Sequence, residues 1–464
     1  MKSGATISIL VAAAAVVYIS MPSRKEPECV MDHTLDMTIE KNIQFHQYPY
    51  EKHKVVTEDG FYLNLIRLPR NDSDRLPVLI VHGFMSSSRA WVAMGPNASL
   101  GYKLYDAGYD VWLADLRGNE YSLEHNTLKK SDPKFWEFSI HEMGLYDQPA
   151  LVDFILNKTG APKLIHLGYS MGSGSFFVMN ALHPEFTHAK VQAHIAMAPG
   201  VFFKHSTSIY WKVHWLFIMV NKRIGDFGSE GAYGHGMMQS ALQGFCTHNT
   251  VTKLIGKLIT SGITGPSDSF NNETIYMSVV KNGLIGSSVR TAEHFLQMHL
   301  SGKFRQFDYG SAESNMQHYG QATPPLYDLS RTTVPVHLFH GSTDAVCSPK
   351  DVETLTLSLQ NLKSTTLINE STFNHADFFI GNKAVMSLNP KLEEILESIS
   401  GNSRKTSEVT EDENTVSCDE TNVNLVEKSP STNISGNDNT NDASSMKSID
   451  KCKSIRQSKN NSDL

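Results

Sequence analysis

The chain has 464 residues, 40% of them hydrophobic, and a formal net charge of −7. This length and apolar content are sufficient for a sizeable core, and the mild charge without a basic block argues against nucleic acid as a partner. The five cysteines stand far apart, so the sequence indicates neither a disulfide framework nor a cysteine metal site.

The N-terminal residues have the pattern of a secretory signal. Lys2 precedes an apolar run over residues 5–19, a length typical of a signal-peptide core and short for a membrane span. Residues 1–22 are therefore predicted to be a signal peptide, with an uncleaved signal anchor as the alternative. We expect a secreted, extracellular or lysosomal protein, or one tethered to a membrane by that anchor. Glycosylation sequons give weak support; they occur at Asn71, Asn97, Asn157, Asn272, Asn369, Asn433 and Asn460.

The folded part is predicted to begin with an edge hairpin. Residues 30–54 are polar and are expected to be irregular. Two β-type runs, 55–57 and 61–68, then flank Asp59 and Gly60. An Asp-Gly pair between such runs is a strong hairpin signal. The sequence therefore predicts two antiparallel edge strands.

A continuous apolar run follows at residues 78–81, and largely apolar runs at 109–114, 164–167 and 193–198 are predicted as further strands. Such runs are typical of parallel strands that are covered on both faces. A helix is predicted to begin at Asp147, with a proline in its first turn. The alternation of strands and helices predicts an α/β fold with a mostly parallel central sheet.

The third apolar run leads directly into Gly168-Tyr169-Ser170-Met171-Gly172. The order strand, G-x-S-x-G and helix is typical of the nucleophile elbow of α/β-hydrolases. Such a turn holds the serine Oγ above the sheet edge, at a helix N-terminus whose N–H groups favour developing negative charge. Ser170 is therefore the predicted nucleophile.

Residues 201–325 interrupt the α/β rhythm with aromatic, Met, Gly and Ser residues and with short helical patterns. We interpret them as an inserted helical cap or lid, and an ordinary helical subdomain is the alternative. The α/β pattern returns at residues 326–400, which complete the hydrolase core begun by residues 30–200. Residues 401–464 lack aromatic side chains and are predicted to be a disordered polar tail.

A serine hydroxyl needs a base to become a good nucleophile. In α/β-hydrolases an acid and then a histidine follow the serine in the chain. Asp344 follows a predicted strand at 336–340, and His375 follows the last predicted strand at 365–368. We predict that Asp344 orients His375, and that His375 takes the proton of Ser170.

Neighbouring titratable side chains are less suitable. Asp351 is expected to lie at the start of a helix, and Asp377 follows the histidine too closely. Most of the 20 histidines are expected to be structural. Three of them are interpreted as packing residues or as residues that support the site from behind: His82, His141 and His166.

The loop after the run at 78–81 begins His82-Gly83-Phe84. A glycine after a buried strand permits close approach of the backbone, so this loop is a candidate source of an oxyanion donor. A simple strand-ending turn is the alternative. The backbone N–H groups of Phe84 and Met171 are the predicted oxyanion donors.

Seven segments together resemble the acid lipase family of α/β-hydrolases, which includes gastric lipase, lysosomal acid lipase and insect lipases. The resemblance covers about residues 45–400, and its marks are YPYEKHKVVTEDGFYL, VHGFMSSSRAWV, LYDAGYDVWLADLRGNEYS, FWEFSIHEMGLYDQPA, GYSMG, GSTDAVCSPKDV and FNHADF. It implies the same nucleophile, acid, base and oxyanion amides, and a cap over the site. It also implies hydrolysis of neutral lipid esters without a metal or cofactor.

The sequence departs from this family at several points. The family usually has GHSQG, whereas Tyr169 and Met171 stand here. A backbone N–H does not depend on its side chain, so Met171 remains a suitable donor. The family often carries a cysteine pair in the cap, but this segment has only Cys246, and no disulfide is expected there. The long polar tail is also unusual for the family.

The sequence thus predicts a serine ester hydrolase, or lipase, that cleaves triacylglycerols or sterol esters through an acyl-enzyme. Its expected partners are the lipid ester and a droplet or micelle surface, with no obligate protein partner. A catalytically silent lipid carrier and an acyltransferase on the same fold are the alternatives. The complete Ser/Asp/His set argues against the carrier. Ser170 argues against a dehalogenase or an epoxide hydrolase, both of which use an aspartate there.

Overall fold

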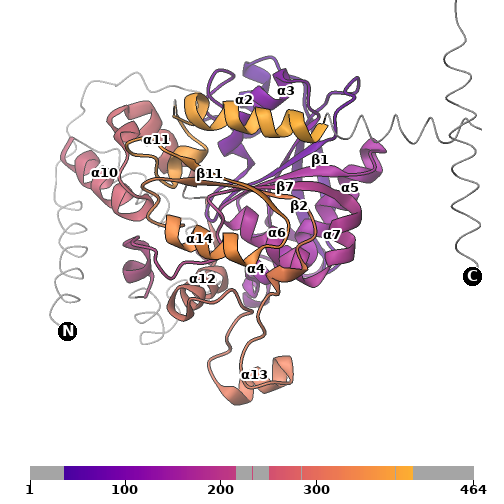
Figure 1. The fold of residues 1–464 in the computed structure, drawn as a ribbon, viewed down its shortest axis with the longest axis vertical. Helices are drawn as coiled ribbons and strands as arrows, with labels where there is room; N and C mark the ends of the chain where they lie inside the picture. Colours follow the sequence, from indigo (N-terminus) through magenta and orange to yellow (C-terminus); the bar gives the residue numbers. More distant parts are fainter. Residues whose placement is uncertain (1–35, 216–231, 234–249, 284, 382, 401–464) are drawn as a thin grey trace, which may run out of the picture. The chain divides into compact units, whose positions relative to one another are not determined.

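The computed structural model describes residues 36–215, 232–233, 250–283, 285–381 and 383–400 (Figure 1). The predicted signal at 1–22 and the predicted tail at 401–464 lie outside the described residues.

A mostly parallel sheet forms the centre of the fold. Within the described residues nine strands make up this sheet, in the order β1-β2-β4-β3-β6-β7-β10-β11, with β5 paired to β2. The strands are β1 Glu51–Val56, β2 Phe61–Leu68, β3 Val78–Val81, β4 Val111–Ala114, β5 Glu124–His125, β6 Leu164–Tyr169, β7 Val191–Met197, β10 Val336–Gly341 and β11 Leu362–Ile368. All pairings from β4 to β11 are parallel, whereas β2 is antiparallel to β1, β4 and β5. The predicted fold class and the antiparallel edge hairpin are therefore confirmed.

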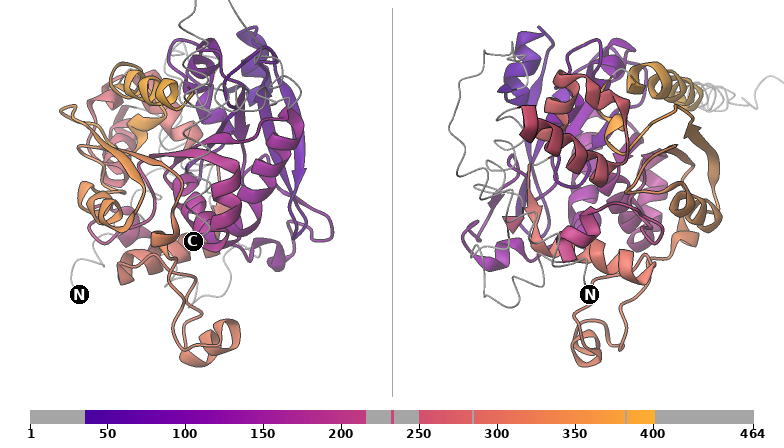
Figure 2. Two further views of the ribbon diagram at one scale, coloured as in Figure 1. Left: turned by 45° about the vertical axis from the view of Figure 1, so that its right-hand side comes forward. Right: turned by 90° about the vertical axis from the view of Figure 1, so that its left-hand side faces the viewer.

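Helices cover both faces of this sheet (Figures 1 and 2). The helix α3 (Leu100–Asp106) and the helix at 389–400 lie on one face. The other face carries α5 Gln148–Thr159, α6 Met171–Leu182, α7 Pro184–Lys190 and α14 Pro349–Ser358. From β3 the chain adds β4 on one side, and from β6 it adds β7 toward the other side of the sheet. Because crossovers between parallel strands are right-handed, the connecting helices α3 and α6 must lie on opposite faces.

The burial of each strand follows from its place in the sheet. Every residue of β3, β4 and β6 is buried, because helices cover both faces there. The edge strand β1 instead alternates between exposed positions and positions that are partly buried or, at Val55, buried, as expected for a strand with one face toward solvent.

Residues 30–54 are not irregular throughout, which corrects the sequence-based prediction. The helix α2 spans Ile39–Phe45, and β1 begins at Glu51. The Thr38 side chain accepts the N–H of Lys41 and caps α2, which buries Ile39 and Ile43. A helix of seven residues with so few buried positions gives little periodic signal.

The predicted helix start at Asp147 is also wrong. Asp147 lies inside a continuous helical stretch made of α4 (Ile140–Glu142), a π-turn at Met143–Asp147, and α5. Its carboxylate binds the Arg117 side chain instead of capping a helix. A second π-turn, at Ala384–Leu388, lies in the last helix, whose described helical residues include Lys383.

The described part of the inserted segment is largely helical. It contains α10 Thr250–Thr264, α11 Glu273–Asn282, α12 Val289–Ser301 and α13 Ala312–Tyr319. A short antiparallel pair, β8 (Ala232–Tyr233) and β9 (Ser287–Ser288), also lies there. Figures 1 and 2 show α10 and α11 side by side. Within the described residues, no helix is both long and apolar enough to cross a membrane.

Candidate active site

Ser170 sits at a strained turn between β6 and α6. Its φ and ψ are 51° and −111°, a region that residues with a Cβ rarely occupy. The Ser170 N–H donates to the Met197 carbonyl over 2.9 Å, and its own carbonyl accepts the N–H of Gly200 over 3.0 Å. These bonds to β7 and the residues after it hold the strained backbone in place.

The two glycines of the pentad are required by close backbone approach. A Cβ on Gly168 would lie 2.6 Å from the backbone nitrogen of Ser173. A Cβ on Gly172 would lie 2.5 Å from the Val81 carbonyl oxygen. Both obstacles are backbone atoms that cannot rotate away, so only glycine fits at these positions.

The structure brings the three predicted triad side chains together. The Nε2 of His375 lies 2.9 Å from the Ser170 Oγ, and its Nδ1 lies 2.8 Å from Asp344 Oδ2. All three residues are buried, with exposed fractions of 6% for Ser170, 4% for Asp344 and 8% for His375. Because Asp344 accepts at Nδ1, the histidine can present an unprotonated Nε2 to the serine.

The second oxygen of Asp344 is held by the backbone. Its Oδ1 accepts the N–H groups of Val346 and Cys347, each over 2.8 Å. These bonds fix the face that the carboxylate turns to His375.

The two rival aspartates have other partners. Asp351 lies in the first turn of α14, where it accepts the hydroxyl of Ser348 and the N–H of His205. Asp377 accepts the N–H of Asn374. Among the described hydrogen bonds, neither carboxylate reaches His375.

The predicted oxyanion residues adjoin the serine. Met171 is the first residue of α6 and follows Ser170 directly. A Cβ on Gly83 would lie 3.2 Å from the Ser170 Cβ, so the Gly83–Phe84 backbone passes against Ser170. The Phe84 ring packs edge-to-face on Phe295, which links this loop to α12.

The three histidines interpreted as packing residues are buried or partly buried and hydrogen-bonded. His166 contacts the Gln148 side chain and His194, and burial lowers the pKa of His166 to about 3. Burial also lowers the pKa of His141, whose Nδ1 lies 2.8 Å from the Tyr327 hydroxyl. Both imidazoles are therefore neutral near pH 7.

Sequence reasoning missed several residues that hold the histidine loop. The Tyr169 hydroxyl donates to the His375 carbonyl over 2.8 Å, and its ring packs on the imidazole. The Thr264 carbonyl, at the end of α10, accepts the N–H groups of His375 and Ala345. The family usually has a histidine at the position of Tyr169. That difference was the one sign in the sequence that Tyr169 has a role of its own. Nothing in the sequence pairs Thr264 with loops 80 or more residues away.

One cluster within the described residues has metal-ligand chemistry. The ligand atoms of Asp344, Cys347 and His375 lie within 4.8 Å of one another. Burial raises the pKa of the Cys347 thiol well above its usual value, and a protonated thiol is a poor ligand. Asp344 and His375 already bind each other, so the cluster does not fit a metal.

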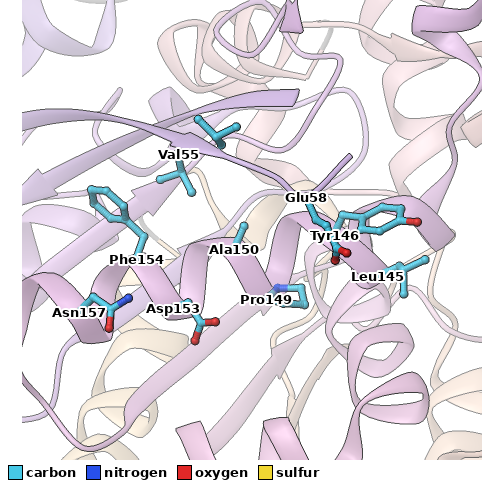
Figure 3. A pocket seen from close by; sticks show the side chains of 10 residues that line it. Val55, Glu58, Leu145, Tyr146, Pro149, Ala150, Asp153, Phe154 and Asn157 are labelled. Carbon is cyan, nitrogen blue, oxygen red and sulfur yellow. The ribbon is translucent and has the colours of Figure 1, made fainter. Parts of the chain in front are cut away.

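A surface pocket lies away from these residues. It is found between β1 and α5, and its lining side chains come from residues 55–58 and 145–157 (Figure 3). None of the triad residues lines it. The candidate site is therefore the elbow and not this pocket.

The chain matches known proteins over most of its length. The family model "alpha/beta hydrolase fold" matches residues 77–381, and the "partial alpha/beta-hydrolase lipase region" matches residues 39–95. Lipase 1 of Drosophila melanogaster is 36% identical over 74% of this chain and 75% of its own length. Gastric triacylglycerol lipase of Bos taurus is 35% identical over 74% of this chain and 86% of its own. Lipase member K of Homo sapiens is 33% identical over 75% of this chain and 88% of its own.

The two family models together span β1 to β11 and the elbow. The N-terminal lipase region includes the edge hairpin and the loop with Phe84. The chain therefore belongs to the acid lipase family of α/β-hydrolases.

Proposed function

We propose that the protein is a serine ester hydrolase that cleaves neutral lipid esters such as triacylglycerols or sterol esters. The observation that carries this proposal is the hydrogen-bonded chain from Ser170 through His375 to Asp344 at a strained elbow. Relatives named gastric triacylglycerol lipase and lipase support the substrate class.

In this proposal His375 takes the proton of Ser170 as the Oγ attacks the ester carbonyl. The resulting oxyanion is stabilised by the N–H groups of Met171 and Phe84, and the helix dipole of α6 adds to this effect. His375 then gives its proton to the leaving alcohol, which leaves an acyl-enzyme on Ser170. Water, activated by the same imidazole, releases the fatty acid.

A lipid droplet or micelle surface is the proposed site of action. Four apolar residues of α10 follow helical spacing and are exposed to solvent, at Leu254, Ile255, Leu258 and Ile259. Leu254 is 59% exposed and Leu258 65% exposed. This apolar face suits contact with lipid. We accordingly propose that residues 201–325 act as a cap through which substrate reaches Ser170.

Hydrolysis of a substrate panel tests the proposed activity. The purified protein should cleave triacylglycerols or sterol esters, measured as released fatty acid between pH 4.5 and 8. A Ser170→Ala variant is the control for contaminating esterases. Tight lipid binding without hydrolysis would favour the silent carrier. Acyl transfer to an added alcohol in preference to water would favour the acyltransferase.

We also propose that the protein enters the secretory pathway, as a secreted, extracellular or lysosomal protein, or as one tethered by its N-terminal segment. The N-terminal pattern and five exposed sequon asparagines support this, at Asn71, Asn97, Asn157, Asn272 and Asn369.

Expression in a eukaryotic cell should therefore give a lumenal or secreted product whose mass falls after glycosidase treatment. An Asn97→Gln variant should lose one glycan, since Asn97 is exposed. Asn272 is a poorer choice, because its side chain caps α11. A cytosolic, unglycosylated product would contradict the proposal.

A further inference from the structure

The buried His82 precedes the Gly83–Phe84 loop, and its hydrogen bonds determine which ring nitrogen carries the proton. The Leu116 N–H donates to His82 Nε2 over 3.1 Å. The Asn119 side-chain amide lies 3.0 Å from the same nitrogen, and its own oxygen is occupied by the N–H of Tyr121. Nε2 therefore accepts, and the proton sits on Nδ1. Burial lowers the pKa of His82, which keeps the ring neutral.

The Nδ1–H of His82 is directed at the carbonyl of Gly83, over 2.8 Å. That carbonyl and the N–H of Phe84 belong to one peptide unit. In a trans peptide the two groups point in opposite directions. Fixing the Gly83 carbonyl on His82 therefore also fixes the direction of the Phe84 N–H.

Asp115 holds the other end of the same loop and the amide that contacts His82. This carboxylate is fully buried at the end of β4. Its Oδ1 accepts from the Ser88 N–H over 2.7 Å and from the Asn119 side chain over 2.8 Å. Its Oδ2 accepts from the Ser88 hydroxyl over 2.6 Å and from the Asn64 side chain over 2.8 Å.

The loop between these two anchors is strained. Met85 has a φ of 58°, which is unfavourable for a residue with a Cβ. Such a conformation persists only where the surroundings hold it. The anchors at Gly83 and Ser88 lie on both sides of Met85 and supply that restraint.

We propose that Asp115, Asn119 and His82 form a positioning chain that aims the Phe84 N–H at the developing oxyanion. This inference rests on the proposed hydrolase function and assigns its residues no contact with the substrate. Asp115 orients Asn119, Asn119 fixes the proton of His82, and His82 fixes the Gly83–Phe84 peptide. The motif Asp115-Leu116-Arg117-Gly118-Asn119 thereby acquires a role in the reaction.

Two substitutions at His82 separate positioning from packing. In His82→Asn the side-chain amide nitrogen takes the place of Nδ1 and retains a donor to Gly83, whereas His82→Leu fills the space without a donor. Loss of a complete oxyanion donor costs roughly 10²–10³ in kcat. His82→Leu should therefore lower kcat at least about tenfold and below that ceiling, with KM on a soluble short-chain ester changed less than about threefold. His82→Asn should recover most of the lost kcat.

A matched pair of buried asparagines tests the next step of the chain. Asn119→Leu removes the amide between Asp115 and His82. Asn180→Leu removes a buried amide of α6 that donates to Thr332 and, among the described hydrogen bonds, makes none to the loop. Both variants should lower the thermal midpoint, but only Asn119→Leu should lower kcat.

Each outcome decides the inference. If wild type hydrolyses the ester while His82→Leu or Asn119→Leu retains kcat within about twofold, the positioning chain is wrong and the hydrolase function stands. Equal losses in His82→Asn and His82→Leu would also overturn it, because the donor would then not matter. A wild-type protein inert on the whole ester panel would refute the proposed function, and this inference with it.

Discussion

Replacing Ser170 by Ala should lower kcat by roughly 10⁴ or more, because among the described hydrogen bonds it is the Ser170 hydroxyl that pairs with His375 Nε2. His375→Ala should cost about as much, since without a base the hydroxyl is hardly activated. Asp344→Asn should cost somewhat less, because the imidazole remains but loses its orienting carboxylate. The rate of fatty-acid release from a soluble ester measures all three.

The double variant Ser170→Ala/His375→Ala is the sharper test. Residues that act in one step give non-additive losses, so the double variant should be little worse than either single variant. Losses that multiply would mean that the two residues do not share a step, and the triad assignment would fail. Ser170→Ala removes only the hydrogen bond to His375 and little side-chain volume. The variant should therefore unfold at a temperature close to that of wild type.

Arg117→Leu should be the most destabilising single substitution among the buried ion pairs. The guanidinium is 1% exposed and lies 2.7 Å from Asp147, which is 0% exposed. It also donates to both oxygens of Asp59 and lies over the Phe61 ring. Removing one partner of such a buried pair leaves an uncompensated charge and costs about 3–5 kcal/mol. Chemical denaturation at pH 8 measures the loss.

The pH dependence and a surface control make this prediction specific. Burial raises the pKa of Asp147 to about 6, and Arg117 opposes that shift. Without Arg117 the folded-state pKa rises further, so the carboxyl binds its proton more tightly folded than unfolded. The free energy of unfolding of Arg117→Leu therefore falls as the pH rises through the folded-state pKa of Asp147. The loss of stability relative to wild type should be smaller at pH 5 than at pH 8. Lys54→Met, which removes an exposed pair with Glu124 and an exposed contact with the Tyr62 ring, should change stability by less than about 0.5 kcal/mol. An Arg117→Leu variant as stable as Lys54→Met would contradict the prediction.

The sheet and the elbow were predictable because their signals are local. Buried parallel strands such as Val78–Val81 consist of one continuous apolar run, and the backbone constraint at Gly168 and Gly172 is written in the pentad itself. The positions of Asp344 and His375 followed from chain order in a known topology. Here the local pattern and the global fold agree.

The parts that sequence reasoning missed depend on contacts between distant segments. The helix α2 is too short to show periodicity. Asp147 has the sequence of a helix start, but its carboxylate is used by Arg117, thirty residues away. The Asp115–Asn119–His82 chain joins two loops that only the parallel pairing of β3 and β4 brings together. Such side-chain pairings have no signature in a single sequence.

The hydrogen bonds between the end of α10 and the loops that carry Ala345 and His375 limit how the proposed cap can be exchanged between relatives. The carbonyl of Thr264 completes the backbone hydrogen bonding of both Ala345 and His375, and the Asn374 side chain binds the carbonyl of Gly265. A Cβ on Gly265 would lie 2.0 Å from the Thr343 carbonyl oxygen. Residues 264–265 therefore belong functionally to the core. A chimera with a foreign segment should keep these two residues native. A recombination boundary placed after Gly265 would instead replace them with residues of the donor protein, and the loops of Ala345 and His375 would lose their native hydrogen-bond partners.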